Sequence, residues 1–239
     1  MPGGRDARGP IGSGDPFRAG HQSPVGSVGE RWVLPGTAAE DRATPTLSEL
    51  FADSPRDAGW AGFLLGQLDR QRPLLWVQDR MAIIESGRAH PPGLNVGELI
   101  HVEARDSKSA LWAMEEGLRC AAIGAVIGEI WGDPAALDFT ATRRLAVAAE
   151  RHGVAAFLVR LSGTANLSGA RLRWRVASAP SLPHPLNPRA PGLATWQAEL
   201  FRARGSMPAT WRIAHEADGL HLVAEPGDRA LDESRRQTG

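Results

Sequence analysis

Through the middle of the chain, short apolar runs alternate with segments in which apolar residues recur at helical spacing. Four runs are mostly apolar, as buried strands are: residues 72–77, 99–103, 125–130 and 154–159. Three segments show helical spacing: residues 57–70, 107–119 and 140–152. Thr140 or Thr142 would cap the last of these helices, and Gly153 stands where a helix C-terminus favours glycine. Apolar strands separated by helices predict an α/β fold with a mainly parallel sheet flanked by helices.

The segment ahead of the first helix carries a helix-start signal. Residues Thr46, Leu47, Ser48 and Glu49 match a capping box and predict a short helix that ends near Phe51. Residues 1–45 are rich in Gly, Pro, Ser and charge, and are predicted to be mostly disordered because they bury too little to offset their ordering entropy. Residues 225–239 are predicted to form a polar tail, so that residues 46–224 make up the folded domain.

The last third of the chain changes to a strand pattern. Residues 171–176 alternate strictly, which places Arg171, Arg173 and Arg175 on one face of a strand and Trp174 on the other, toward the core. Residues 196–204, the turn at 205–208 and residues 210–215 predict a C-terminal antiparallel β-hairpin extension. Residues 180–191 hold five prolines and are predicted to be a loop.

Composition excludes several classes of protein. The chain has 239 residues and a single cysteine, Cys120, which excludes a disulfide framework and is predicted to be a small buried side chain. The seven histidines show no metal-ligand spacing, so no metal is expected. No apolar run has the roughly 18–20 residues that span a bilayer, and no signal peptide is evident. The expectation is a soluble, cytoplasmic protein that does not contact a membrane.

The net charge of zero conceals a segregation of charge. Residues 1–138 carry a net −6, residues 139–212 a net +9 and residues 213–239 a net −3. The central excess points to a polyanion or an acidic protein as partner; the alternative is the solvated face of an arginine-rich protein. The candidate binding residues are arginines of this region, which can meet phosphates or carboxylates with two hydrogen bonds each. They are Arg160, Arg171, Arg173, Arg175, Arg202 and Arg204.

Motifs for nucleotide chemistry are incomplete. A phosphate-binding loop needs a glycine-rich turn that ends in a lysine, but the only lysine is Lys108, preceded by Ser107. Glu129 ends a predicted strand, where α/β folds place ligand-binding groups; the alternative is a strand-end carboxylate in solvent. No nucleophile elbow of the type Gly-x-Ser-x-Gly occurs. No catalytic residue and no cofactor are therefore expected.

The order of elements between Pro73 and Ile130 resembles the central part of the RecA/Rad51 recombinase core. More closely, several segments resemble the ImuA family of alphaproteobacterial damage-inducible mutagenesis proteins, which is RecA-like and related to SulA. These segments are residues 111–120, 140–146, 157–160, 173–181 and 196–205, and the resemblance spans roughly residues 46–215.

The resemblance implies a RecA-like fold and an accessory role in SOS mutagenesis. Such proteins work in translesion synthesis with ImuB, a Y-family polymerase homologue, and with an error-prone replicative-type DNA polymerase. Contact with RecA and with DNA is an expectation by analogy. The alternatives left open are a DNA-binding or RecA-filament-modulating module, a degenerate RecA-type nucleotide-binding protein, and a division inhibitor like SulA.

The chain departs from recombinases where ATP is handled. Residues 53–59 occupy the place of the phosphate loop without its lysine or its glycine pair. Asp79 and Glu129 stand at degenerate nucleotide-site positions, near the catalytic glutamate and the Walker B aspartate of a recombinase. The counterparts of the DNA-gripping loops, residues 132–137 and 162–170, are short. A non-enzymatic adaptor is therefore expected.

Overall fold

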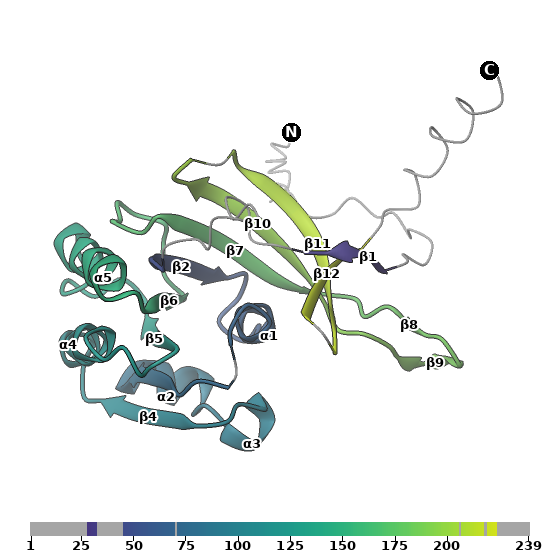
Figure 1. Cartoon of the computed structure of the whole chain (residues 1–239), viewed down its shortest axis with the longest axis horizontal. Coiled ribbons are helices and arrows are strands. Elements are labelled where there is room, and N and C mark those ends of the chain that lie inside the picture. Colours follow the sequence, from purple (N-terminus) through teal and green to yellow (C-terminus); the bar gives the residue numbers. More distant parts are fainter. Residues whose placement is uncertain (1–27, 33–44, 70, 206, 218, 224–239) are drawn as a thin grey trace, which may run out of the picture.

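A ten-stranded mixed sheet organises the chain, with helices on both faces of its parallel half (Figure 1). The computed structural model describes residues 28–32, 45–69, 71–205, 207–217 and 219–223. The sheet strands are β1 (Val28–Arg31), β2 (Leu47–Ala52), β3 (Leu74–Asp79), β4 (Leu99–Ala104), β5 (Ala125–Trp131), β6 (Ala155–Leu161), β7 (Leu172–Ala179), β10 (Thr195–Ala203), β11 (Ala209–Glu216) and β12 (Gly219–Val223). The helices are α1 (Gly59–Leu65), α2 (Arg80–Ser86), α3 (Pro91–Leu94), α4 (Ser107–Leu118) and α5 (Phe139–His152).

The strand order is β1-β12-β11-β10-β7-β2-β6-β5-β3-β4. From β7 to β4 every neighbouring pair runs parallel, which confirms the predicted α/β class with a mainly parallel, helix-flanked sheet. From β7 to β1 the pairing is antiparallel throughout, and it includes the predicted hairpin, β10 with β11. The antiparallel extension is thus larger than the single hairpin that the pattern predicts.

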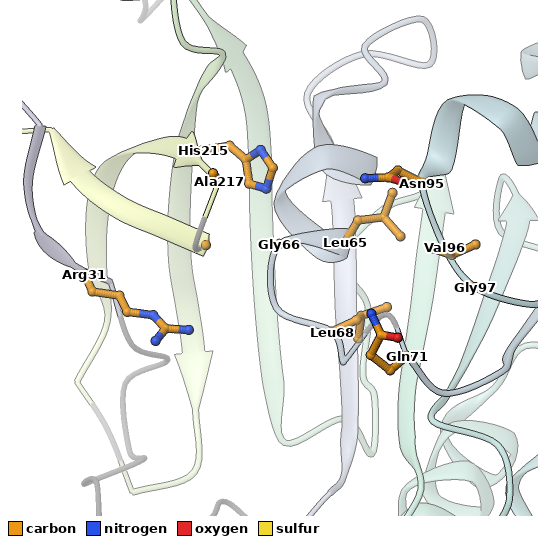
Figure 2. A pocket seen from close by; sticks show the side chains of 11 residues that line it. Arg31, Leu65, Gly66, Leu68, Gln71, Asn95, Val96, Gly97, His215 and Ala217 are labelled. Atoms are coloured by element: carbon orange, nitrogen blue, oxygen red, sulfur yellow. The ribbon is translucent and has the colours of Figure 1, made fainter.

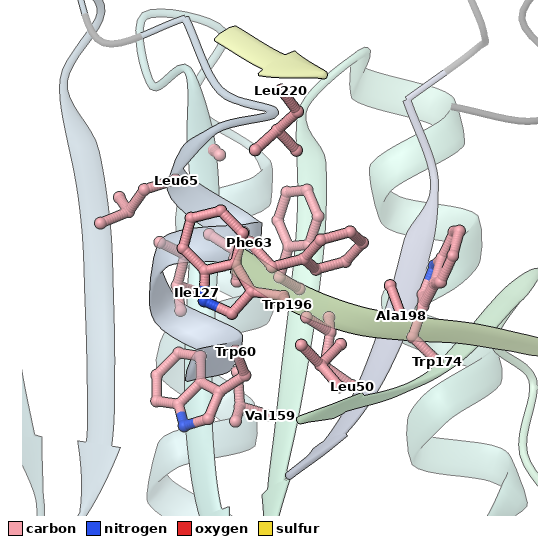
Figure 3. Close-up of a cluster of buried hydrophobic side chains, with 14 of the residues drawn as sticks. Leu50, Trp60, Phe63, Leu65, Ile127, Val159, Trp174, Trp196, Ala198 and Leu220 are labelled. Carbon is pink, nitrogen blue, oxygen red and sulfur yellow. The ribbon is translucent and has the colours of Figure 1, made fainter. Parts of the chain in front are cut away.

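Two clusters of buried apolar side chains, one on each face of the sheet, pack the helices against the strands. On one face, α4 and α5 lie side by side and bury Met114, Leu118 and Leu145 against the parallel strands. On the other face, α1 packs Phe63 against Trp174, with ring centroids 5.4 Å apart (Figure 3). Trp174 is 1% exposed, which confirms its predicted place in the core.

The predicted helix at residues 46–51 is wrong, because this segment forms β2. The strand pairs in parallel with both β6 and β7, and its first five side chains are all buried. In a capping box the Glu49 carboxylate would accept from the Thr46 amide, whereas here it accepts from Arg160 and Arg173, and the Thr46 hydroxyl donates to Glu150. Tertiary pairing on two sides therefore overrides the local helix signal.

Three further sequence-based expectations need correction. Val28–Arg31 pairs with β12 and Trp32 is buried, although they fall within the segment predicted to be disordered. The rest of residues 1–44 and residues 224–239 lie outside the described residues. The proline-rich loop contains a two-stranded sheet of β8 (Pro183–His184) and β9 (Asn187–Pro191). Asp138, rather than a threonine, caps α5 by accepting a 2.7 Å hydrogen bond from the Ala141 amide.

The contact between α1 and β10 depends on a glycine. A Cβ atom on Gly62 would lie 2.3 Å from Cζ2 of Trp196, a rigid ring in the cluster of Figure 3. We expect Gly62→Ala to lower the free energy of unfolding by about 1–3 kcal/mol, although alanine favours helix, because the ring must shift. Urea denaturation measures this loss.

Gly93→Ala in α3 is the matched control for Gly62→Ala. A Cβ atom on Gly93 would meet its nearest neighbour, Cδ2 of His90, at an ordinary 3.4 Å. We therefore expect no loss of stability from Gly93→Ala. Equal effects of the two substitutions would refute the packing argument.

Candidate functional site

The segment between β2 and α1, which the sequence predicts to stand in the place of a phosphate loop, presents a carboxylate to the start of α1. Asp57 Oδ1 accepts hydrogen bonds from the Gly59 amide at 2.8 Å and from the Ser178 hydroxyl at 2.5 Å. Its Oδ2 accepts from the Ser178 amide at 2.7 Å. Partial burial acts to raise the pKa of Asp57, but these hydrogen bonds outweigh it and lower the pKa. A negative charge of the chain itself thus stands beside the first amide of α1, where it would oppose a bound anion.

Lys108 lies on the other side of the sheet from this segment. It belongs to the first turn of α4, which packs with α5, whereas α1 packs on the opposite face. The only lysine of the chain is therefore not near the segment predicted to stand in the place of a phosphate loop.

The carboxyl ends of β3 and β5 bring close together Asp79 and Glu129, the two residues predicted at degenerate nucleotide-site positions. Asp79 accepts hydrogen bonds from the Ala82 amide at 2.7 Å and from the Trp131 amide at 3.3 Å. It thereby caps α2 and ties the end of β3 to the end of β5. Burial raises the pKa of Asp79 above its usual value in spite of these bonds.

Glu129 is buried rather than a strand-end carboxylate in solvent. It is 3% exposed and accepts a 2.5 Å hydrogen bond from Nε1 of Trp76 on the neighbouring strand. Burial raises the pKa of Glu129 to about 7, and the nearby charge of Asp79 adds to the shift. The Glu129 carboxyl group therefore changes from protonated to ionised close to neutral pH.

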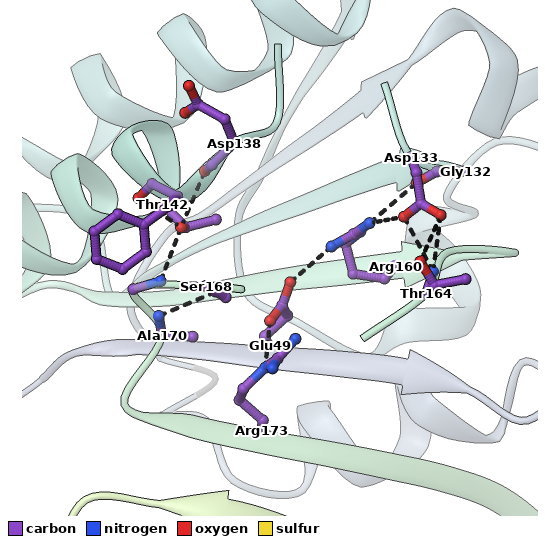
Figure 4. Close-up of polar contacts among 12 residues, drawn as sticks. Glu49, Gly132, Asp133, Asp138, Thr142, Arg160, Thr164, Ser168, Ala170 and Arg173 are labelled. Carbon is purple, nitrogen blue, oxygen red and sulfur yellow. Dashed lines mark hydrogen bonds and ion pairs between the residues drawn. The ribbon is translucent and has the colours of Figure 1, made fainter. Parts of the chain in front are cut away.

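Two of the six candidate arginines are buried around a single carboxylate, and this arrangement is called here the Glu49 network (Figure 4). Glu49 accepts hydrogen bonds from Arg160 at 2.9 Å and from Arg173 at 2.7 Å, and none of the three side chains is more than 4% exposed. Arg160 also pairs with Asp133. Arg160 and Arg173 therefore lie inside the junction of β2, β6 and β7, and neither is available on the surface as a binding residue, which corrects both predictions.

The other four arginines remain at the surface and are called here the β7–β10 arginine surface: Arg171, Arg175, Arg202 and Arg204. Arg171 pairs with Glu150 at 2.7 Å, and Arg175 with Glu199 at 3.0 Å. Arg202 follows an irregularity in the pairing of β10 with β7, and among the described residues neither Arg202 nor Arg204 forms an ion pair within 4 Å, although the charge of Arg204 helps to lower the pKa of Glu150.

A phenylalanine lies between the buried and the exposed arginines. The Phe201 ring has the Arg173 guanidinium 5.2 Å from its centroid and the Arg175 guanidinium 4.3 Å from it. Phe201 also packs against Phe51, with centroids 5.8 Å apart. These cation–π contacts order the exposed Arg175 side chain against the sheet.

The two short loops at the carboxyl ends of β5 and β6 are tied to each other. Asp133 accepts hydrogen bonds from the amide of Thr164 at 3.0 Å and from its hydroxyl at 2.8 Å (Figure 4). The Gly169 amide donates to the Thr142 hydroxyl of α5 at 2.9 Å. The loops are thus fastened to the body of the domain.

Sequence reasoning did not foresee the cavities. One, of ≈ 480 Å³, lies between the end of α1 and the β11–β12 turn, where Arg31 and His215 face Gln71 and Asn95 (Figure 2). A second, of ≈ 450 Å³, opens beside Glu129 and is described below. Each draws its lining from four or more separate segments, and no spacing along the chain signals such a site.

Three further features of the described residues concern the cysteine, metal ligands and apolar helices. Cys120 is exposed, which corrects its predicted burial; it lies just after the end of α4. The described residues hold no group of three or more His, Cys, Asp or Glu placed to bind a metal ion. Within the same residues, none of the helices has the length and apolarity to cross a bilayer.

Comparison with known proteins decides the family. The chain is 31% identical over 187 residues to protein ImuA of Caulobacter vibrioides, in strain NA1000 and in strain ATCC 19089, with 70% of this chain and 72% of the relative covered. The chain belongs to the ImuA family. This confirms the resemblance seen in the sequence, and it indicates involvement in damage-inducible mutagenesis. No family model matches the chain.

Proposed function

We propose that this ImuA family member is a non-catalytic accessory protein of SOS-induced error-prone translesion DNA synthesis. In this proposal it bridges an ImuB-type Y-family polymerase homologue and an error-prone replicative-type DNA polymerase, on a RecA-like core, with RecA and DNA as further contacts. The observation that carries the non-catalytic part is the Asp57 carboxylate, which takes the amide and hydroxyl donors where a nucleotide phosphate would bind.

The Glu49 network and Asp79 support the same proposal. A site for nucleotide hydrolysis needs polar groups that are free to meet phosphate, metal or water. Asp79 instead caps a helix, and Arg160 and Arg173 neutralise Glu49 within the sheet. Asp79, Glu49, Arg160 and Arg173 are thus engaged in contacts within the chain, as in a structural rather than a catalytic arrangement.

Ligand-dependent thermal stability tests the proposal. A ligand that binds only the folded state raises the midpoint, by the equivalent of about 2.7 kcal/mol at a hundred times its dissociation constant. We expect the C-terminal region of ImuB to raise the midpoint and millimolar Mg-ATP to leave it unchanged. A rise with Mg-ATP would overturn the non-catalytic assignment, and no rise with the ImuB segment would overturn the bridging role.

Charge reversal tests the β7–β10 arginine surface as the partner-binding surface. Arg173 is unsuitable for this test, because a glutamate there would face Glu49 inside the sheet. We expect the triple variant Arg175→Glu, Arg202→Glu and Arg204→Glu to weaken binding of the ImuB segment by at least about tenfold, since like charges oppose association with an acidic partner. Isothermal titration calorimetry measures the affinity.

The matched control reverses three exposed arginines on other elements, Arg80, Arg105 and Arg189. It changes the net charge of the protein by the same amount, so it corrects for long-range repulsion. We expect this control to bind the ImuB segment nearly as the parent protein does. If both triple variants lose the same affinity, the β7–β10 surface is not the partner site.

A DNA-binding or RecA-filament-modulating module is the second candidate function. The observation in its favour is that Arg202 and Arg204 have no ion-pair partner among the described residues. This candidate predicts a strong salt dependence. If several phosphates are neutralised by arginines, the affinity for single-stranded DNA should fall steeply between 50 and 200 mM salt. Fluorescence anisotropy of a labelled oligonucleotide measures this slope, and absent or salt-insensitive binding excludes the candidate.

A further inference from the structure

A cavity of ≈ 450 Å³ opens at the carboxyl ends of β3 and β5, on the face of the sheet that α1 covers. β3 continues into α2 on this face, while β5 continues toward α5 on the opposite face. The chain thus leaves two neighbouring parallel strands in opposite directions, and this is where open α/β sheets form ligand crevices.

A buried carboxyl group lines this cavity. Glu129 is 3% exposed and lines the cavity together with Trp76, whose Nε1 donates to it at 2.5 Å. Among the described residues Glu129 has no ion-pair partner, in contrast to Glu49, which has two. A buried carboxylate is costly unless it is paired, so the cavity lacks the charge that would complement its lining.

Two indole rings form part of the same wall. Trp60 of α1 and Trp76 of β3 both line the cavity, and their ring centroids lie 6.0 Å apart at 50°. Indole faces attract organic cations, most strongly where water is excluded. A carboxyl group beside two indoles is chemistry that recognises a cation.

The charged residues around the opening favour a cation over an anion. The lining holds two basic side chains, Arg56 and Arg88, and three acidic ones, Asp57, Glu85 and Glu129. Arg88 is already paired, with Glu103 at 2.5 Å. When Glu129 is ionised the lining is therefore net negative.

One wall of the cavity is held in place without a ligand. Gln78 donates a 3.0 Å hydrogen bond to the Gly87 carbonyl and accepts one of 2.9 Å from the Ala89 amide. These bonds anchor residues 87–89 against β3. A pre-formed wall lowers the entropy that a ligand must lose on binding.

We propose that this cavity binds a guanidinium or ammonium group on a short aliphatic chain, with Glu129 as its counter-ion and Trp60 and Trp76 as its aromatic wall. The group can come from a free amine or from an arginine or lysine side chain of another polypeptide. The proposal does not depend on the partners named above.

Proton linkage gives the binding a second signature. A bound cation pairs with ionised Glu129, whose pKa burial raises to about 7. The titratable groups around Glu129 are Asp79 on β3, Asp57 before α1, Glu85 and Arg88 around the end of α2, and His101 on β4. The His101 ring is hydrogen-bonded to the side chain of Gln78. With a pKa near 7 the ionised fraction rises from about one tenth at pH 6 to about nine tenths at pH 8, so the affinity should rise about tenfold.

The test uses the full chain with L-argininamide as probe and, as matched control, L-citrullinamide, in which a neutral urea replaces the guanidinium and the α-amino group is the same. We expect L-argininamide to bind in isothermal titration calorimetry at pH 8 and L-citrullinamide not to bind. Glu129→Gln, which keeps an acceptor for Trp76, should abolish binding and its pH dependence. Glu98→Gln, at an exposed carboxylate outside the cavity, should change neither.

The remaining outcomes decide against the proposal or identify the source of the cation. Equal binding of the two amides, no binding of L-argininamide, or unchanged binding by Glu129→Gln would each overturn it. Agmatine and the blocked tripeptide acetyl-Ala-Arg-Ala-amide then separate the two sources. Binding of both indicates a side chain of a polypeptide, and binding of agmatine alone indicates a free amine.

Discussion

Glu49→Gln is expected to lower the free energy of unfolding by about 3–5 kcal/mol, because it leaves two buried guanidinium groups without their shared counter-ion. Arg160 and Arg173 are each 3% exposed and donate to Glu49 at 2.9 and 2.7 Å. Asp133 stays beside Arg160, but no other carboxylate of the described residues pairs with Arg173. Urea denaturation measures the loss without adding salt that would screen the charges.

Glu150→Gln is the matched control for this prediction. It removes the partner of Arg171, but in that pair the side chains are 33% and 32% exposed. Ion pairs in contact with water contribute about 0–1 kcal/mol, so the loss should stay within that range. A similar loss from both variants would mean that burial of the Glu49 network has no energetic consequence.

A triple replacement separates the cost of an unpaired charge from the strength of the network. Glu49→Leu, Arg160→Met and Arg173→Leu together remove all three charges of the network, and they leave Asp133, which is 34% exposed, without its arginine. Apolar side chains of similar volume often replace a buried ion pair without loss. We expect the triple variant to be more stable than Glu49→Gln alone. Lower stability would show that the network itself, and not the unpaired charge, supplies the stability.

Glu129→Gln is expected to stabilise the protein at pH 8 and to have little effect at pH 5. The folded-state pKa of Glu129 is about 7, against an ordinary 4.5. Between these values the unfolded chain loses the proton that the folded state retains, so the stability of the parent protein falls as the pH rises. Above pH 7 the loss is complete, at about 3 kcal/mol for a shift of this size. Glutamine cannot ionise, so Glu129→Gln does not undergo this loss of stability.

Unfolding free energies of the parent and Glu129→Gln proteins, compared at pH 5, 6, 7 and 8, measure this effect. The difference between the two proteins should grow from pH 5 to pH 7 and level off toward pH 8. Glu98→Gln, at an exposed carboxylate, serves as control and should show no such trend. A difference that is the same at pH 5 and pH 8 would mean that Glu129 titrates as an ordinary surface carboxyl group.

The parallel core was predictable because its signals are local. The apolar runs that became β3, β4, β5 and β6 and the helical spacing that became α4 and α5 are properties of single segments. Gly153 at φ 67° ends α5 as its position in the sequence indicates. Such signals depend on neighbouring residues and not on the rest of the fold.

The candidate site was predictable only in its residue types. Alternation in β7 correctly placed the arginines on one face and Trp174 in the core. It could not tell that Arg173 is covered and paired while Arg175 is exposed, because that depends on Glu49, 124 residues away in the sequence. The capping box at residues 46–49 likewise could not predict that this segment forms a strand, because β2 pairs with β6 and β7, which lie far away in the sequence.

The amino-acid pattern alone therefore determined the α/β class, the core faces of α4 and β7, the family and the excess of arginine in the central third. The tertiary structure alone decided which charges are buried, which of them have partners and where the cavity beside Glu129 opens. The physical reason is the distance along the sequence between the residues that interact. Secondary structure and amphipathicity arise within a few residues, whereas the burial and pairing of a charge depend on segments that only the folded sheet brings together.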